Sequence, residues 1–333
     1  MAAIHQPTPS SLRQLARVLV AGGLVAVPTE TVYGLAANAL DPRACRAIFR
    51  AKRRPLSDPL IVHVGSAAAA AKLAILNPAA RALMRAFWPG PLTLVLQKRE
   101  IVPAVATAGG PTVAVRCPAH PVMRRLLRLC RLPLAAPSAN PFGFISPTTA
   151  AHVEAGLGGR IDHILDGGPC RVGVESTIVD VSDPSSPEIL RVGGITAKQI
   201  AAALGRPVPV RNQAVTTQSP LRAPGLLTRH YSPRTPLQLH ARITRARLRQ
   251  AGADEGFLLF ARPAGPELRS AARIEVLSAR GSPAEAARRL FARLHVLDRA
   301  RLRQLHAELA PEVGAGIAVN DRLRRAAAKR SGQ

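Results

Sequence analysis

The chain has 333 residues, 47% of them apolar and only 3% aromatic, so it is long enough for two globular domains with aliphatic cores. Its 46 Lys and Arg residues against 20 Asp and Glu give a formal net charge of +26, which favours phosphate-bearing ligands. The charge alone does not establish a nucleic-acid surface, because only five of the basic residues are Lys and a GC-rich genome produces the same Arg bias.

Apolar periodicity predicts alternating helices and strands over the first 205 residues. Helices are expected at residues 10–21, 42–52, 67–76, 78–87, 121–130, 148–157 and 196–205. Strands are expected at residues 24–27, 60–64, 92–96, 113–116, 134–136, 164–165, 177–181 and 189–192. Asp41 before Pro42 is typical of an N-cap followed by proline at the first helical position. The irregular alternation favours an α/β fold with a mixed sheet.

The second part of the chain begins with a change of composition. Residues 206–235 lack periodicity and are rich in Pro, Thr, Gln and Ser, as linkers are. Strands are then predicted at 257–260 and 274–277, and helices at 283–297 and 321–328. We therefore predict a large domain over residues 1–206, a linker that acts as a lid over 207–235, and a small Rossmann-like α/β domain over 236–333.

The cysteines and the N-terminal segment indicate the compartment. Cys45, Cys117, Cys130 and Cys170 form no CxxC pair and have no nearby His that would complete a zinc pattern. Four scattered thiols suit a reducing compartment. The apolar run at 15–27 is too short to span a bilayer and lacks the layout of a signal peptide. We expect a soluble, cytoplasmic protein with no membrane partner.

A rigid basic corner is the most informative local feature. Lys52, Arg53 and Arg54 stand together, and Pro55 and Pro59 stiffen the loop that follows them. Such a corner can hold an anion at fixed distances, because little entropy remains to be lost on binding. A solvated basic turn before a strand would show the same residues.

Four other segments carry polar side chains at strand or helix ends. The turn at 28–35 (PTETVYGL) presents two hydroxyls, a carboxylate and a phenol after a buried strand, where open α/β sheets place ligands. Ser138 and Ser146 lie in a Pro-rich loop, the second just before a predicted helix. Residues 173–180 bring hydroxyls to a strand start, and Arg191 ends a later strand. Each segment could instead have a purely structural role, as a polar turn, a capping serine or a surface ion pair.

The linker motif and the missing motifs narrow the chemistry. Arg229, His230 and Tyr231 are unusual in a linker and suggest a lid over a cleft. The chain has no GxxxxGK[ST], no GxGxxG at a strand–helix turn and no GxSxG elbow. Hydroxyls with Arg and Lys then favour a site that binds phosphates and a small zwitterion, and that catalyses by positioning and electrostatics.

These segments occur in the order of one known family. PTETVYGL, K-x-RP…PLIVH, FWPGPLTLVL, TVAVRCPAHP, APSANPFGFISPT, ESTIVD and ILRVGG cover about residues 15–205, and RHYSP and GIAVNDRLRRAA follow. The chain thereby resembles the two-domain L-threonylcarbamoyladenylate (threonylcarbamoyl-AMP) synthase family over nearly its whole length. The resemblance implies a YrdC-like catalytic domain, a twisted mixed sheet with an open central cleft, followed by the small domain.

The resemblance also implies an activity. The family is a nucleotidyltransferase that makes threonylcarbamoyl-AMP and pyrophosphate from L-threonine, bicarbonate or CO2 and ATP, with Mg²⁺ carried by ATP and no metal held by the chain. The product serves the threonylcarbamoyl modification of the tRNA adenosine beside the anticodon, so downstream transfer proteins are implied partners, while direct tRNA contact is not required. The alternative is a non-catalytic YrdC-like module that binds double-stranded RNA or tRNA through the +26 charge.

By resemblance, residues of the motifs acquire roles. The threonine pocket would be lined by Thr31, His63, Arg116 and Thr177. ATP or the adenylate would be contacted by Arg54, Asp58, Thr112, Ser138, Ser146, Arg191 and Tyr231. Lys52 and Arg54 would be catalytic, because their charges would offset the charge that grows on the phosphoryl oxygens. Asp58 stands where some members carry Asn, so backbone contact with phosphate is expected there, and Ala136 stands where some members carry Thr.

Overall fold

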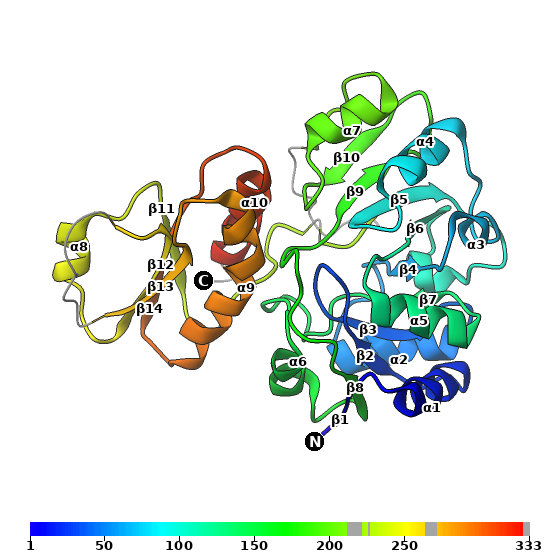
Figure 1. The fold of residues 1–333 in the computed structure, drawn as a ribbon, viewed down its shortest axis with the longest axis horizontal. Helices are drawn as coiled ribbons and strands as arrows, with labels where there is room; N and C mark the ends of the chain where they lie inside the picture. The colour runs from blue at the N-terminus through cyan, green and yellow to red at the C-terminus, as the bar shows by residue number, and fades with distance from the viewer. Residues whose placement is uncertain (212–221, 226, 264–271, 329–333) are drawn as a thin grey trace. The chain divides into compact units, whose positions relative to one another are not determined.

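The computed structural model describes residues 1–211, 222–225, 227–263 and 272–328 (Figure 1). The chain divides into two compact units. The N-terminal unit comprises Met1–Phe142, Pro147–Arg171 and Glu175–Leu227, and the C-terminal unit comprises Gly143–Ser146, Val172–Val174 and the chain from Thr228 onward. Two short segments that interrupt the N-terminal unit in the sequence therefore belong to the C-terminal unit.

The N-terminal unit contains a mixed sheet, which confirms the predicted architecture. Its strands are β1 (Ala3–His5), β2 (Val25–Val27), β3 (Gly34–Asn38), β4 (Ile61–His63), β5 (Leu92–Gln97), β6 (Thr112–Arg116), β7 (Leu134–Ala135), β8 (His163–Leu165), β9 (Thr177–Asp180) and β10 (Glu188–Arg191). Their order across the described sheet is β1-β8-β2-β3-β7-β4-β6-β5-β9-β10. Parallel pairs such as β4 with β6 alternate with antiparallel pairs such as β5 with β6.

Three helices of this unit, α1 (Pro9–Val20), α2 (Pro42–Lys52) and α4 (Pro78–Phe87), begin where a capping side chain precedes proline. The other described helices are α3 (Ala67–Ala71), α5 (Pro121–Cys130), α6 (Ala150–Leu157), α7 (Ala197–Leu204) and the 3-10 helix η1 (Ala104–Thr107). The side chains of Asp41 and Asn77 accept backbone N–H groups at the starts of α2 and α4, as their sequence signatures predict.

Three predicted helix boundaries in this unit were wrong, and in the C-terminal unit the helix predicted to begin at residue 321 begins at Ala315. The first helix begins at Pro9, because Thr8 rather than a serine accepts the Ser11 N–H group. The helix expected at 67–76 ends at Ala71, because the Ile75 N–H group bonds to Gln97 O at 2.9 Å and draws the chain to the sheet. The helix expected at 148–157 begins at Ala150, so Ser146 does not adjoin its N-terminus.

Aliphatic side chains fill both faces of this sheet, as the composition predicts. One cluster includes Leu35, Ile48 and Leu94, and a second includes Leu15 and Leu126 where α1 meets α5. Figure 1 shows α1 beside α5, and α4 beside α7 near β10. This packing anchors the strand ends from which the polar side chains of the site project.

The C-terminal unit has a second, parallel sheet. Its strands are β11 (Leu237–His240), β12 (Glu255–Ala261), β13 (Arg273–Ser278) and β14 (Gln304–Glu308), in the order β11-β14-β12-β13. Its described helices are α8 (Arg245–Arg249), α9 (Pro283–Arg299) and α10 (Ala315–Ala327). The Rossmann-like α/β expectation is confirmed, although sequence analysis missed β11, β14 and α8, which are short and rich in polar residues.

The predicted linker is only partly described, since residues 212–221 and 226 lie outside the described ranges. In the N-terminal unit, Val210 forms a bridge with Ile189 and Ala223 is buried. In the C-terminal unit, the Ser232 N–H group donates to Gly143 O at 2.8 Å. Across the described part of the chain, no helix combines the length and apolar character needed to cross a membrane.

Candidate active site

The turn between β2 and β3 is organised by one threonine. The Thr29 hydroxyl donates to Val32 O at 2.6 Å and accepts the N–H groups of Thr31 and Val32 at 3.1 and 3.2 Å. Tyr33 serves the fold, because its hydroxyl donates to Gly168 O at 2.8 Å and burial raises its pKa. The turn therefore has a rigid backbone from which neighbouring side chains reach the sheet.

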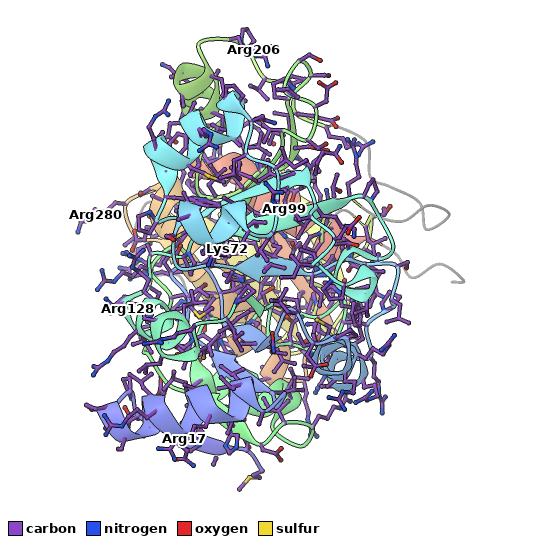
Figure 2. All side chains as sticks on the ribbon, turned by 90° about the vertical axis from the view of Figure 1, so that its right-hand side faces the viewer. Arg17, Lys72, Arg99, Arg128, Arg206 and Arg280 are labelled. Atoms are coloured by element: carbon purple, nitrogen blue, oxygen red, sulfur yellow. The ribbon has the colours of Figure 1, made fainter. Side chains whose placement is uncertain are left out.

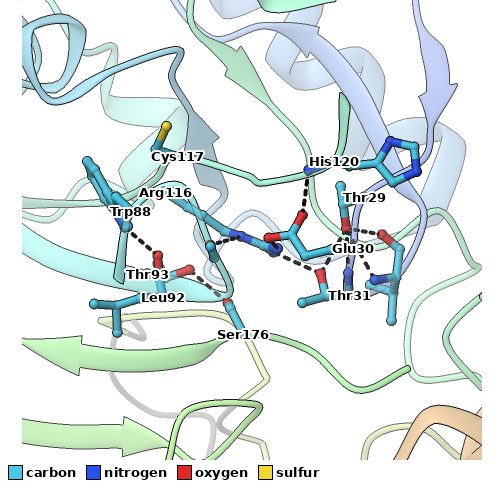
Figure 3. A network of polar contacts seen from close by, with 12 residues as sticks. Thr29, Glu30, Thr31, Trp88, Leu92, Thr93, Arg116, Cys117, His120 and Ser176 are labelled. Carbon is cyan, nitrogen blue, oxygen red and sulfur yellow. Dashed lines mark hydrogen bonds and ion pairs between the residues drawn. The ribbon is translucent and has the colours of Figure 1, made fainter. Parts of the chain in front are cut away.

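Arg116, at the end of β6, is the centre of a buried polar network (Figure 3). Its guanidinium contacts Glu30 Oε1 at 2.6 Å, Thr31 Oγ1 at 2.9 Å and Gly90 O at 3.3 Å. The Arg116 and Glu30 side chains are 5% and 9% exposed. Although burial opposes ionisation, the charge and hydrogen bonds of Arg116 hold the pKa of Glu30 below its ordinary value. The ion pair thus gives Arg116 a fixed orientation.

His63 ends β4 beside Arg116, its partner in the parallel β4–β6 register. The residue is 2% exposed, and neither ring nitrogen has a hydrogen-bond partner among the described residues. Burial, together with the charge of Arg116, lowers the pKa of His63 to about 3, so the imidazole is neutral near pH 7. A buried polar group without a protein partner needs an explanation, and a bound ligand supplies one.

Ser176 joins this network to a second arginine. Thr93 faces Arg116 in the β5–β6 register, and its hydroxyl lies 2.8 Å from the Ser176 hydroxyl. Arg191 donates to both Ser176 O and Ser176 Oγ at 3.1 Å, and to Pro224 O at 3.2 Å. Ser176 therefore links Thr93, which faces Arg116 across the strand pair, to Arg191 at the end of β10.

Lys52 lies at the last turn of α2, and Arg53 ends that helix in a left-handed conformation with φ of 52°. The Lys52 ammonium is buried and donates to Ser138 O at 2.5 Å and to Asn140 O at 2.6 Å. Burial, with Arg54 nearby, lowers the pKa of Lys52. The ammonium thus ties the basic corner to the loop that carries Ser138.

Arg54 and Asp58 form a buried ion pair in the same corner. Arg54 Nη2 lies 2.9 Å from Asp58 Oδ1, and the guanidinium also donates to Asp58 O and Pro59 O at 3.0 and 2.6 Å. Burial raises the pKa of Asp58, while Arg54, Lys52 and Arg191 act in the opposite direction. The carboxylate is therefore compensated by cations rather than presented alone to a phosphate.

The structure brings Thr31, His63 and Arg116 together, and Thr177 lies on β9, two strands from the β6 strand of Arg116. The Thr177 hydroxyl is already engaged, since it donates to Ile195 O at 2.6 Å and accepts the Ile195 N–H group at 3.0 Å. Lys52, Arg54, Asp58 and Arg191 form a second cationic group that includes the Ser138 carbonyl.

One predicted site residue lies apart from these two groups, and two others belong to the C-terminal unit. Thr112 begins β6, at the opposite end from Arg116. Ser146 and Tyr231 belong to the C-terminal unit, where His295 Nε2 lies 3.1 Å from Ser146 O. The Tyr231 ring packs 5.5 Å from the ring of Phe291.

Sequence analysis did not assign Glu30, Thr93 or Ser176 to the site. Glu30 had a signal, because an acidic residue between two threonines in a buried turn requires a cationic partner. No sequence pattern indicated Thr93 or Ser176, since only the pairing of β5 and β9 places their hydroxyls together. Within the described ranges, no three His, Cys, Asp or Glu residues gather as a metal site would require. Hydroxyl, guanidinium and ammonium groups of this kind are suited to bind anions and a small zwitterion.

Two family models together match most of the chain. Residues 17–193 match the Sua5/YciO/YrdC family, described as "Telomere recombination", and residues 195–328 match "Threonylcarbamoyl-AMP synthase, C-terminal domain". The threonylcarbamoyl-AMP synthase of Pyrococcus abyssi is 42% identical and covers 93% of this chain and 92% of its own length. That of Bacillus subtilis is 40% identical, with 96% and 93% covered.

Solved structures agree. The crystal structure of P. abyssi Sua5 complexed with L-threonine has a TM-score of 0.89 and 37% identity, and covers 98% of each chain. The fold is thus that of the two-domain Sua5-type proteins. The chain belongs to the threonylcarbamoyl-AMP synthase family, which confirms the resemblance seen in its motifs.

Proposed function

We propose that this protein is a nucleotidyltransferase that synthesises L-threonylcarbamoyl-AMP and pyrophosphate from L-threonine, bicarbonate or CO2 and ATP. The product would serve the threonylcarbamoyl modification of the tRNA adenosine beside the anticodon. Family membership supports the reaction, and one structural observation carries it. Thr93 faces Arg116 in the β5–β6 register and its hydroxyl bonds to that of Ser176, while Ser176 accepts a hydrogen bond from Arg191, whose charge acts on Asp58 in the group around Lys52 and Arg54.

The Arg116 network has the chemistry of an amino-acid pocket. Thr31, His63 and Arg116 offer a hydroxyl, a neutral imidazole with two unsatisfied nitrogens, and a guanidinium held in place by Glu30. A carboxylate and a hydroxyl on the ligand would satisfy such groups. Because the Thr177 hydroxyl is bonded to Ile195, we propose that Thr177 contacts threonine through its methyl group.

The reaction needs no covalent enzyme intermediate. The amine of threonine attacks CO2, or bicarbonate with loss of water, and gives an N-carboxylate. An oxygen of that carboxylate attacks the α-phosphorus of ATP, and the bond to pyrophosphate breaks with its electron pair on the leaving oxygen. Lys52 and Arg54 would offset the negative charge that grows at phosphorus and on the leaving group. The carbonyl groups and Asp58 that hold these cations keep them in position before ATP arrives.

ATP would be contacted by residues from several segments. They are Arg54, Asp58, Thr112, Ser138, Ser146, Arg191 and Tyr231. Mg²⁺ would supply further positive charge at the phosphates, and the ATP oxygens would provide its ligands. This part of the proposal rests on the family motifs, on the coupling of Asp58 to Arg191 and on the bridge that places the segments of Ser146 and Tyr231 side by side in the C-terminal unit.

We extend the proposal to the domain roles and the cellular setting. Residues 1–206 would form the catalytic domain, 207–235 a linker and lid, and 236–333 a domain that supports the lid. The lid would shield the labile mixed anhydride from water. The protein would act in the cytoplasm and pass its product to tRNA threonylcarbamoyl-transfer proteins.

The test is a pyrophosphate-release assay with each substrate omitted in turn. We expect release to require ATP, L-threonine and bicarbonate together, and ¹³C-bicarbonate to label threonylcarbamoyl-AMP by one mass unit in the mass spectrum. Equal release without threonine would contradict the proposal. Salt-sensitive RNA binding with no pyrophosphate release would instead support the binding-module alternative.

A further inference from the structure

A cavity of about 380 Å³ lies within the N-terminal unit, outside the Arg116 network. Its walls come from the start of α3, one face of α4, the chain that follows α4, and the start of α5. The side chains that define it are Ser66, Arg81, Arg85, Trp88, Cys117 and Arg124. None of these residues has a role in the reaction proposed above.

Three arginine side chains line this cavity. Arg81 and Arg85 stand one turn apart on α4, and Arg124 Nη1 lies 3.8 Å from Cys117 Sγ at the half-buried side of the cavity. In the part of the chain that the structure describes, no carboxylate forms an ion pair with any of the three. The chain has a large excess of cations, and Figure 2 shows Arg17, Arg128 and Arg206 at separate places on the N-terminal unit. Another hollow, lined by Arg234, Arg299 and Arg301, also contains Asp298, whereas no carboxylate lines this cavity.

The chemistry of the walls indicates the ligand. Guanidinium groups bind phosphate oxygens in bidentate geometry, and three of them match a group with more than one negative charge. Met84 and the ring of Trp88 provide an apolar wall beside them. The volume lies at the lower end of the range for small-molecule sites. A recess of this size with one aromatic ring does not offer the successive stacking surfaces that RNA uses.

We propose that this cavity is a second anion site, which binds a small phosphate-bearing molecule with its phosphate against Arg81, Arg85 and Arg124. The site lies next to the reaction centre in the chain. Trp88 Nε1 donates to Leu92 O at 2.8 Å, and Gly90 O accepts Arg116 Nε at 3.3 Å.

Figure 3 shows Trp88 and Cys117 on one side of Arg116 and Glu30 on the other. A ligand in the cavity would therefore contact the segment 88–92, whose Gly90 carbonyl bonds to Arg116. Binding would alter the position of Arg116 through that segment.

The experiment uses the fluorescence of Trp88, the sole tryptophan of the chain. The full-length protein is titrated with inorganic pyrophosphate, and separately with AMP, at constant ionic strength. We expect a saturable change in emission for at least one of these probes. The Arg81→Ala/Arg85→Ala variant should need about tenfold more of that probe, because two charge-assisted contacts are lost.

Two controls separate this cavity from other effects. Arg125→Ala/Arg128→Ala on α5 removes the same charge away from the cavity and should leave the titration unchanged. Arg54→Ala/Asp58→Asn alters two of the residues proposed to contact ATP and should also leave the titration unchanged.

Three results would overturn the proposal. They are an absence of saturable change in the wild-type protein, an equal loss in the α5 control, or a loss only in the Arg54→Ala/Asp58→Asn variant. Binding of an RNA oligonucleotide that the α4 substitutions abolish, with no response to either small anion, would replace the proposed ligand with RNA. These measurements detect binding and not catalysis. They therefore test the cavity even if the protein does not catalyse the proposed reaction.

Discussion

Removal of Arg54 should affect both stability and catalysis, and the structure offers a way to separate the two. Arg54 Nη2 lies 2.9 Å from Asp58 Oδ1, and the two side chains are 3% and 1% exposed. Arg54→Ala leaves the Asp58 carboxylate buried without this partner. Arg54→Ala/Asp58→Asn removes both charges and keeps a side chain of nearly the same shape.

The expected stability change follows from the burial of the pair. Loss of one partner of a buried ion pair costs about 3–5 kcal/mol in the free energy of unfolding near pH 7. The double variant should recover most of that loss, because the remaining cost is that of an imperfectly bonded amide, about 1–3 kcal/mol.

The pH dependence has a definite sign. Burial already raises the pKa of Asp58, and loss of Arg54 removes the largest influence that lowers it. Protonated Asp58 is tolerated in the folded state, so the deficit of Arg54→Ala should be small at low pH. The deficit should grow as pH rises and become constant above the raised pKa of Asp58.

Two assays test this reasoning. Urea unfolding followed by Trp88 fluorescence reports the stability of the N-terminal unit, and pyrophosphate release reports the reaction. We expect both variants to lose roughly 30- to 1,000-fold in kcat/KM, the scale of one preorganised charge worth about 2–4 kcal/mol. A double variant no more stable than the single one would refute the charge-burial argument. Recovery of activity in the double variant would exclude Arg54 from catalysis.

Three other buried groups give measurable expectations. Below pH 6.5, the wild-type protein should lose about 1.4 kcal/mol of stability per pH unit down to the folded-state pKa of His63, about 3, because only the unfolded state takes up the proton. His63→Phe should abolish this acid-dependent loss and should raise the KM for threonine. Thr177→Val should lower the free energy of unfolding by about 1–3 kcal/mol, since both backbone groups of Ile195 lose a partner, whereas Thr177→Ser should restore it. Glu30→Gln should cost about 3 kcal/mol at pH 7, and the difference from wild type should narrow as pH falls below 4.5, because the pKa of Glu30 is lowered by Arg116.

Each expectation has an outcome that would contradict it. Identical acid sensitivity of wild type and His63→Phe would mean that the imidazole is not buried as a neutral group. A stable Thr177→Val protein with an unchanged melting temperature would show that the hydroxyl is dispensable. A constant difference between wild type and Glu30→Gln from pH 7 to pH 3 would mean that the ion pair does not govern stability.

The sequence by itself determined the local structure and the identity of the motifs. Pro42 and Pro78 each follow a capping side chain, so hydrogen bonds within a few residues set the starts of α2 and α4. The order of the motifs predicted the family, and residue types predicted anion chemistry at Lys52 and Arg54. These features depend on neighbours in the chain, which a sequence displays directly.

Only the tertiary structure decided which polar groups meet. Strand β3 lies between β2 and β7 although its sequence, GLAAN, carries little strand signal, because pairing on both sides and burial outweigh local propensity. Three contacts join residues that are more than 80 positions apart in the sequence: Glu30 with Arg116, Thr93 with Ser176, and Lys52 with the Ser138 carbonyl. Burial then makes each contact obligatory, because a charge or hydroxyl removed from water must be paired within the protein or by its ligand.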